Sequence, residues 1–269
     1  MMKPVVSIEE AQQIFHPSSR GPGRLLTNFF PNTDKLNNWI AHKQIFSYET
    51  IGARFLLQRD GDFYHLFFCA ANPEHLVGGV KELTMSIGDP IVVDLLGGKR
   101  EIEVLVEKFN HCKFQLYATL QRMTKAILPA EQFTVDCSVV YGNRQDALII
   151  YQLFLEHFDR FVEQIPAENE LLDAAENKQL LVVKNDNKLE GFLFFERTGL
   201  MGIVRYWFVD NRNRGGGVGA KLMRTFLAKN LGINRVVLWV LRNNDDAIRK
   251  YEHYGFMPDR LLDYVMMKG

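Results

Sequence analysis

The stretch Val209-Asp210-Asn211-Arg212-Asn213-Arg214-Gly215-Gly216-Gly217-Val218-Gly219-Ala220-Lys221-Leu222 decides the fold. The β-branched and aromatic residues of 202–209 predict a strand before it, and the apolar spacing of Val218, Leu222 and Phe226 predicts a helix over 218–229. Four glycines lie within the five positions 215–219. Backbone N–H groups at a glycine-rich helix N-terminus bind anions, and Arg214 adds a positive charge. The stretch therefore predicts a cradle for a phosphate group.

Two common nucleotide-binding loops do not fit this cradle. A nucleoside-triphosphate loop ends in Gly-Lys-Ser/Thr, whereas here Ala220-Lys221-Leu222 lacks the last glycine and the hydroxyl. The dinucleotide pattern fits Gly215, Gly217 and Ala220 literally, but a polar loop separates these residues from the strand. The strand expected over 235–241 also ends in leucine instead of the acidic residue that binds a ribose.

A third pattern fits. Arg214-x-x-Gly217-x-Gly219 resembles the Arg/Gln-x-x-Gly-x-Gly/Ala signature of the GNAT superfamily of acyl-CoA-dependent N-acyltransferases. Downstream, Asn244-x-x-Ala247-x-x-x-Tyr251-x-x-x-Gly255-Phe256 is similar to the second conserved segment of that family at every anchor position. The closing residues 264–268 resemble its usual last strand. The resemblance covers about residues 133–269.

The resemblance and the hydrophobic pattern together predict an α/β (α+β) fold, with a mixed central sheet flanked by helices. We expect domains at 1–130 and 131–269, the second GNAT-like and the first a smaller α+β domain. In the second domain the pattern predicts strands and helices in the order β-α-α-β-β-β-α-β-α-β. The expected ranges are 133–141, 146–161, 166–177, 179–185, 188–197, 202–209, 218–229, 235–241, 245–254 and a strand after 256.

The resemblance implies acetyl-CoA as co-substrate. Backbone groups of Phe208 and Val209 would pair with the pantetheine arm like an added strand. Asn244 would bind the same arm. The pyrophosphate would lie on Arg214, Gly215, Gly216, Gly217, Val218, Gly219 and Ala220.

Direct transfer of an acyl group to an amine needs a base for the amine and an acid for the departing thiolate. The motif places Tyr251 as the acid, although a tyrosine there can also simply pack the helix on the sheet. The expected strand 202–209 contains no carboxylate. Glu196 on the preceding strand, or Tyr206 acting through a water, are the candidate bases.

Composition limits the partners. The chain has 269 residues with 32 Lys+Arg and 32 Asp+Glu, so its net charge is zero. This balance gives no electrostatic case for nucleic acid or for an anionic membrane. The 3 cysteines are widely spaced, which argues against disulfides and against a metal site. We expect a cytoplasmic protein, monomeric or homodimeric.

The first 130 residues carry a weaker pattern. The same order of a strand, a helix and an aromatic residue is expected in residues 91–114 and in residues 235–256. A helix expected over 73–85 would then correspond to the helix that follows the glycine loop. Because no Arg-x-x-Gly-x-Gly precedes that helix, we expect either a degenerate GNAT-like copy without a phosphate cradle or an unrelated α+β domain.

The predicted function is an N-acetyltransferase that acts on a primary amine of a small molecule or peptide. A non-catalytic acyl-CoA-binding sensor is the alternative, and no residue pattern identifies the acceptor.

Overall fold

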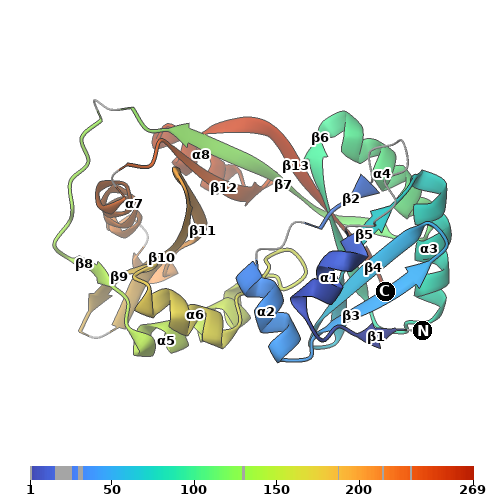
Figure 1. Ribbon diagram of the computed structural model, residues 1–269. Coiled ribbons are helices and arrows are strands. Elements are labelled where there is room, and N and C mark those ends of the chain that lie inside the picture. The colour runs from blue at the N-terminus through green and yellow to red at the C-terminus, as the bar shows by residue number, and fades with distance from the viewer. Residues whose placement is uncertain are drawn as a thin grey trace. The chain divides into compact units, whose positions relative to one another are not determined.

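The structure, a computed structural model, describes residues 2–15, 26–29, 33–128, 131–186, 188–213, 215–230 and 232–269. The chain divides into two compact units, Met1–Leu120 with Arg260–Gly269, and Gln121–Asp259 (Figure 1). The sequence predicted a boundary at residue 130. The observed division comes ten residues earlier and assigns the last ten residues to the first unit.

The first unit contains a sheet with helices on both faces. Its strands follow the order β1-β3-β4-β5-β6-β13, and β2 pairs with β5. Its elements are β1 (Lys3–Pro4), α1 (Ile8–Phe15), β2 (Leu26–Thr27), α2 (Thr33–Ala41), β3 (Ile45–Thr50), β4 (Ala53–Asp60), β5 (Phe63–Ala70), α3 (Pro73–Met85), β6 (Ile91–Gly98), α4 (Lys99–His111) and the start of β7 (Gln115–Ala126).

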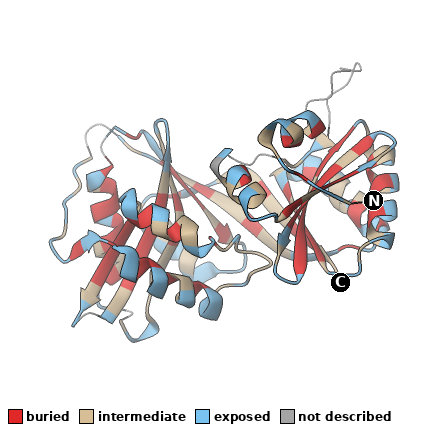
Figure 2. Ribbon diagram, turned by 60° about the horizontal axis from the view of Figure 1, so that its bottom comes forward, coloured by how far each residue is buried: buried red, intermediate tan, exposed pale blue. Residues whose placement is uncertain are grey.

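Alternating residues of these strands pack against different helices, as the two-residue period of a strand requires. Leu66 and Phe68 of β5 lie in a core cluster with Leu76 of α3 and Phe109 of α4. Phe67, between them, packs in a second cluster with residues of α1 and α2. Figure 2 shows buried residues along these strands and on the facing sides of the helices.

The second unit repeats this arrangement. Its strands follow the order β7-β12-β11-β10-β9-β8. Its further elements are β8 (Val139–Tyr141), α5 (Arg144–His157), α6 (Glu168–Glu176), β9 (Leu180–Asn185), β10 (Lys188–Thr198), β11 (Met201–Val209), the 3-10 turn η1 (Asn211–Asn213), α7 (Val218–Lys229), β12 (Arg235–Leu241), α8 (Asp245–His253) and the start of β13 (Met257–Lys268). The predicted class, a mixed sheet flanked by helices, is confirmed.

Helices cover both faces of this sheet as well (Figure 1). Phe192 and Tyr206 pack with α5 and α6 in one buried cluster. Leu193 and Val204 point the other way, into a cluster with α7 and the partly buried Tyr251 of α8. The alternation along β10 and β11 therefore separates the α5–α6 face from the α7–α8 face.

The strand predicted over 133–141 is shorter in the structure. It covers only Val139–Tyr141, because the preceding residues form a turn. The Asp136 carboxylate accepts from the Ser138 N–H at 2.9 Å, and the Asp136 carbonyl accepts from the Val139 N–H at 3.1 Å. These local bonds use the groups that a strand would need for its neighbour.

The closing strand pairs differently from the expectation. The sequence predicted residues 264–268 as the last strand of the second domain. The structure pairs Leu261–Lys268 of β13 antiparallel with Gly98–Ile91 of β6, inside the first unit. In the second unit, β7 takes the position beside β12.

Candidate functional site

The site begins where two parallel strands separate. The ladder between β11 and β12 runs from the pair Met201–Arg235 to the pair Val204–Leu238. Beyond Val204, β11 continues to Val209 without pairing to β12. On its other edge β11 stays paired with β10 up to Val209. One edge of residues 205–209 therefore faces β12 without being paired to it, and its N–H and C=O groups can bind an extended ligand.

A β-bulge sets the point of separation. Along β10, Phe194 opposes Tyr206 while the next residue, Phe195, opposes Val204. Arg205 is the extra residue between them. A bulge increases the local twist of a strand, which turns the following residues away from the neighbouring strand.

A cavity of about 550 Å³ occupies the opening. It extends from the N-terminus of α7, past the separated strands, to the loop after α5. Its walls include residues 205–209 of β11, 217–220 of α7 and its cap, 239–241 of β12, Asn244, Ala247 and Tyr251 of α8, and Phe158 and Glu163 of the loop. All of these residues belong to the second unit.

One end of the cavity is the N-terminus of helix α7. Gly217 is the N-cap of α7, with φ +77° and no side-chain cap. The left-handed backbone favours glycine at this position. The first N–H groups of a helix have no partner inside the helix, so those of Val218, Gly219 and Ala220 are available to an anion.

The glycines of this end serve different purposes. A side chain at Gly219 would lie 3.1 Å from the Trp207 ring, so its absence lets the indole lie against the first turn of α7. The Gly216 N–H donates to the Asn213 carbonyl at 3.2 Å and is thus already used. Gly215 lines the cavity. Arg214 lies outside the described residues.

The predicted residues Phe208, Val209 and Asn244 all line the cavity. The Asn244 side-chain oxygen accepts from the Ala247 N–H at 3.1 Å and so caps α8. This capping fixes the start of the helix that carries Tyr251, and it leaves the Asn244 amide nitrogen without a role in the cap.

Tyr251 reaches the cavity from α8. Its ring centre lies 5.6 Å from that of Trp207. Burial, with a smaller contribution from the charge of Glu163, raises the pKa of Tyr251 to about 12. The phenol therefore keeps its proton at neutral pH and is a donor there.

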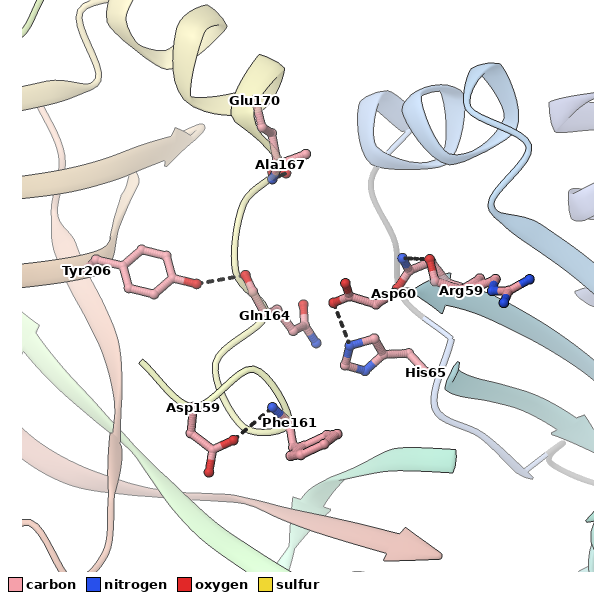
Figure 3. A network of polar contacts seen from close by, with 10 residues as sticks. Arg59, Asp60, His65, Asp159, Phe161, Gln164, Ala167, Glu170 and Tyr206 are labelled. Atoms are coloured by element: carbon pink, nitrogen blue, oxygen red, sulfur yellow. Dashed lines mark hydrogen bonds and ion pairs between the residues drawn. The ribbon is translucent and has the colours of Figure 1, made fainter. Parts of the chain in front are cut away.

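The two predicted bases are engaged elsewhere. The Tyr206 hydroxyl donates to the Gln164 carbonyl at 2.7 Å, and burial raises the pKa of this phenol above its ordinary range (Figure 3). Glu196 lies outside the cavity wall, and its carboxylate pairs with Arg205 at 2.5 Å. Tyr206 therefore lines the cavity and holds the loop after α5 through Gln164, whereas Glu196 does not line the cavity.

Glu163 and Asp246 are the carboxylates that line the cavity, and neither is among the site residues predicted from the sequence. Burial and, secondarily, the neighbouring charge of Asp159 raise the pKa of Glu163 to about 7. A group with this pKa exchanges a proton readily near neutral pH. The cavity thus contains a proton acceptor and a proton donor, Glu163 and Tyr251.

Two contacts hold the loop on either side of Glu163. Asp159 organises a turn, since its carboxylate accepts from the Phe161 N–H at 2.9 Å and its carbonyl accepts from the Glu163 N–H at 2.7 Å. On the other side, the Tyr206 hydroxyl fixes Gln164 (Figure 3). The position of Glu163 is therefore set by β11 and by the turn.

No local pattern marks Glu163. It follows α5 in a segment without a motif, and its place in the cavity depends on the packing of α5 and on the bond from Tyr206. The feature of the sequence that could have pointed to Glu163 is a carboxylate among apolar residues just after a helix, in Phe161-Val162-Glu163-Gln164-Ile165.

The described residues hold neither a cluster of metal-binding side chains nor a membrane-crossing helix. Within them, no group of three or more His, Cys, Asp or Glu side chains is placed to hold a metal ion. Over the same part of the chain, no helix has the length and apolar character needed to cross a membrane.

Comparison with known proteins finds a family match within the second unit. Residues 148–256 match the acetyltransferase (GNAT) family, and this match contains all the cavity residues described above. None of the curated proteins that were compared matches the chain.

Solved structures resemble the chain over a longer stretch. An acetyltransferase from the GNAT family of Colwellia psychrerythraea is 14% identical, covers 98% of this chain and 99% of its own, and has a TM-score of 0.55. A probable N-acyltransferase from Enterococcus faecalis is 10% identical over 100% of this chain and 72% of its own, with a TM-score of 0.57.

A tandem GNAT protein from the clavulanic acid biosynthesis pathway is 10% identical and covers 83% of this chain and 82% of its own, with a TM-score of 0.58. At such identities these likenesses concern the fold. Together with the family match, they lead to one conclusion: residues 148–256 match the GNAT family of acetyltransferases, and the fold of the chain is similar to that of solved GNAT proteins.

Proposed function

We propose that the second unit transfers an acetyl group from acetyl-CoA directly to a primary amine of a small molecule or peptide. The observation that carries the proposal is a single cavity that joins the uncapped N-terminus of α7 to Tyr251 and Glu163. It provides one end for an anion and another for proton transfer, which are the two requirements of this chemistry.

The anion-binding end of the cavity suits the pyrophosphate of CoA. The N–H groups of residues 218–220, at the first turn of α7, supply directed donors, and Lys250 of α8, which lines the same cavity, supplies a positive charge. We assign Gly215, Gly217, Val218, Gly219 and Ala220 to this group, with Arg214 as a further ligand. Gly216 forms a turn through its bond to Asn213, and this turn orients the neighbouring N–H groups toward the pyrophosphate.

The open edge of β11 suits the pantetheine arm. This arm is a chain of amides, which bond to a strand edge in the same way as a peptide does. Phe208 and Val209 offer that edge, because their ladder with β12 has already ended. Asn244 lines the same cavity and offers a side-chain amide.

Glu163 is the general base of the proposal. An alkylammonium must lose a proton before its nitrogen can attack, and a free alkylamine has a pKa of about 10. With a pKa of about 7, the Glu163 carboxylate is largely ionised at pH 8 and can accept that proton, directly or through a water.

Tyr251 is the general acid. The neutral amine nitrogen forms a bond to the acetyl carbon and loses its second proton to solvent, the carbon–sulfur bond breaks, and the departing thiolate takes the proton of the Tyr251 hydroxyl. A phenol with a pKa of about 12 is fully protonated before the step, and the proton held by Glu163 can restore it through solvent.

Thiol release from acetyl-CoA across a panel of primary amines tests the proposal, together with calorimetric binding of acetyl-CoA. We expect binding and amine-dependent thiol release. Binding without turnover on any amine, with no change in Tyr251→Phe, would favour the sensor function. Absence of binding to any CoA ester would exclude both functions.

A further inference from the structure

The two units contain the same elements in the same order. The first runs β1, α1, α2, β3, β4, β5, α3, β6, α4, β7, and the second runs β8, α5, α6, β9, β10, β11, α7, β12, α8, β13. The strands also lie in the same spatial order, β1-β3-β4-β5-β6 against β8-β9-β10-β11-β12. Among the described residues, only the turn η1 and the strand β2 have no counterpart.

The parallel strands separate in the first unit too. β5 pairs with β6 at Tyr64–Ile91 and His65–Val92, and β5 then continues to Ala70. Residues 66–70 of β5 thus correspond to residues 205–209 of β11, which form the open edge in the second unit. The first unit therefore has the same kind of opening between the same two strands.

The extra strand β2 fills this opening. Leu26 and Thr27 pair antiparallel with Ala70 and Cys69 at the end of β5. Asn28 follows, and its side-chain amide donates to the Leu66 carbonyl of β5 at 2.9 Å and to the Asp94 carbonyl of β6 at 3.1 Å. Its oxygen accepts from the Phe68 N–H at 2.7 Å. One amide thus bridges both separated strands.

These are the contacts that an amide ligand would make. The pantetheine arm has N–H and C=O groups to offer to a strand edge, and Asn28 offers one of each to the edges of β5 and β6. Phe29 anchors the segment, since its ring stacks on Phe15 at 4.0 Å and contacts Phe67 edge-on at 5.5 Å. The segment 26–29 is therefore tied to the sheet by backbone, amide and aromatic contacts.

The helix that would hold the phosphates is also closed in the first unit. α3 corresponds to α7, but Asn72 caps it by accepting from the His75 N–H at 2.9 Å. Pro73 occupies the first helical position and has no N–H to donate. α7, in contrast, has glycine at its N-cap and no side-chain cap.

We propose that the first unit is a second copy of the same fold whose acyl-CoA groove is occupied by the chain's own segment Leu26–Phe29, with Asn28 in place of the pantetheine amides. The inference rests on the proposed function, because it takes the groove of the second unit as the acyl-CoA site. Its consequence is that each chain binds one acyl-CoA and that the edge of β5 takes no ligand.

Hydrogen exchange of the full chain with and without CoA, combined with calorimetry, tests this inference. We expect one CoA per chain, slower exchange at the amides of residues 218–220, and unchanged exchange at residues 66–70. Two CoA molecules per chain, or slower exchange along 66–70 on binding, would overturn it.

A variant isolates the role of Asn28. Asn28→Ala removes the acceptor of the Phe68 N–H, and exchange of that amide should accelerate about tenfold or more without CoA. Asn110→Ala, at an exposed position of α4 in the same unit, should leave it unchanged. Unaltered exchange at Phe68 in Asn28→Ala overturns the inference. If no CoA binds at all, the proposed function fails, while this exchange still reports on the occupied groove.

Discussion

Glu163→Gln tests the proposed base, because it keeps the shape of the side chain and removes its ability to accept a proton. In the native protein the Glu163 pKa is about 7. The ionised fraction of such a group is about 0.1 at pH 6 and about 0.9 at pH 8, so kcat/KM should rise about tenfold between these values. In Glu163→Gln this rise should vanish, and the rate at pH 8 should fall about 10²-fold.

The same variant should gain stability at high pH. Burial raises the pKa of Glu163 from 4.5 to about 7, which means that folding favours the protonated form. The stability contribution of the carboxyl is therefore fully present below about pH 4.5 and is lost as the pH rises through about 7. The full change corresponds to about 3 kcal/mol, so Glu163→Gln should unfold at higher denaturant than the native protein at pH 8, with little difference at pH 4.

The assays are thiol release from pH 6 to 9 and urea unfolding at both ends of the range. Glu168→Gln is the matched control, since Glu168 is an exposed carboxylate of the following helix. A Glu163→Gln enzyme that keeps the native pH profile, or one with native activity at pH 8, would refute the assignment. A loss of activity accompanied by a loss of stability at pH 8 would refute the burial argument.

Three further predictions concern other parts of the second unit. Tyr251→Phe should lower kcat about 10²-fold with acetyl-CoA affinity changed less than about twofold, as seen in initial rates and calorimetry; an unchanged kcat would exclude the acid role. Gly217→Ala, at φ +77°, should weaken acetyl-CoA binding at least about tenfold, whereas Gly78→Ala adds the same methyl in open space within α3 and should leave affinity intact. Phe154→Ala removes a fully buried ring that packs on Phe192 and Tyr206, and should lower the free energy of unfolding by about 3–5 kcal/mol in denaturant titrations.

The helix N-terminus that lines the cavity could be predicted from the sequence because its geometry is local. A strand, a glycine loop and a helix that follow one another along the chain place their backbone N–H groups together whatever the rest of the fold does. Gly217 and Asn244 illustrate this, since each acts on the helix that it begins.

The catalytic end could not be predicted in the same way. Glu163 lies far along the chain from Tyr251, and the fold brings them to one cavity through the bond from Tyr206 to Gln164. The sequence placed the base on β11 or β10 by resemblance. The β-bulge at Arg205 could not be predicted from residues 202–209 alone, because it depends on how β11 pairs with β10.

The pairing of the closing strand could not be predicted from the sequence for a related reason. Strand pairing depends on partners distant in sequence, and β13 has the same apolar alternation whether it lies beside β12 or β6. Nothing in residues 264–268 distinguishes the two neighbours. The correspondence between residues 91–114 and residues 235–256 could be predicted from the sequence, because in each unit a strand, a helix and an aromatic residue follow one another in the same order.

The pairing of β13 with β6 has a consequence for biosynthesis. As the chain leaves the ribosome, β6 is made early, yet its partner residues Leu261–Lys268 come only after the whole second unit. Until then, β6 presents an unpaired strand edge, which is a surface on which other nascent chains can assemble. The first unit completes its sheet only after translation of the second, so the domain that is made first is the one that is finished last.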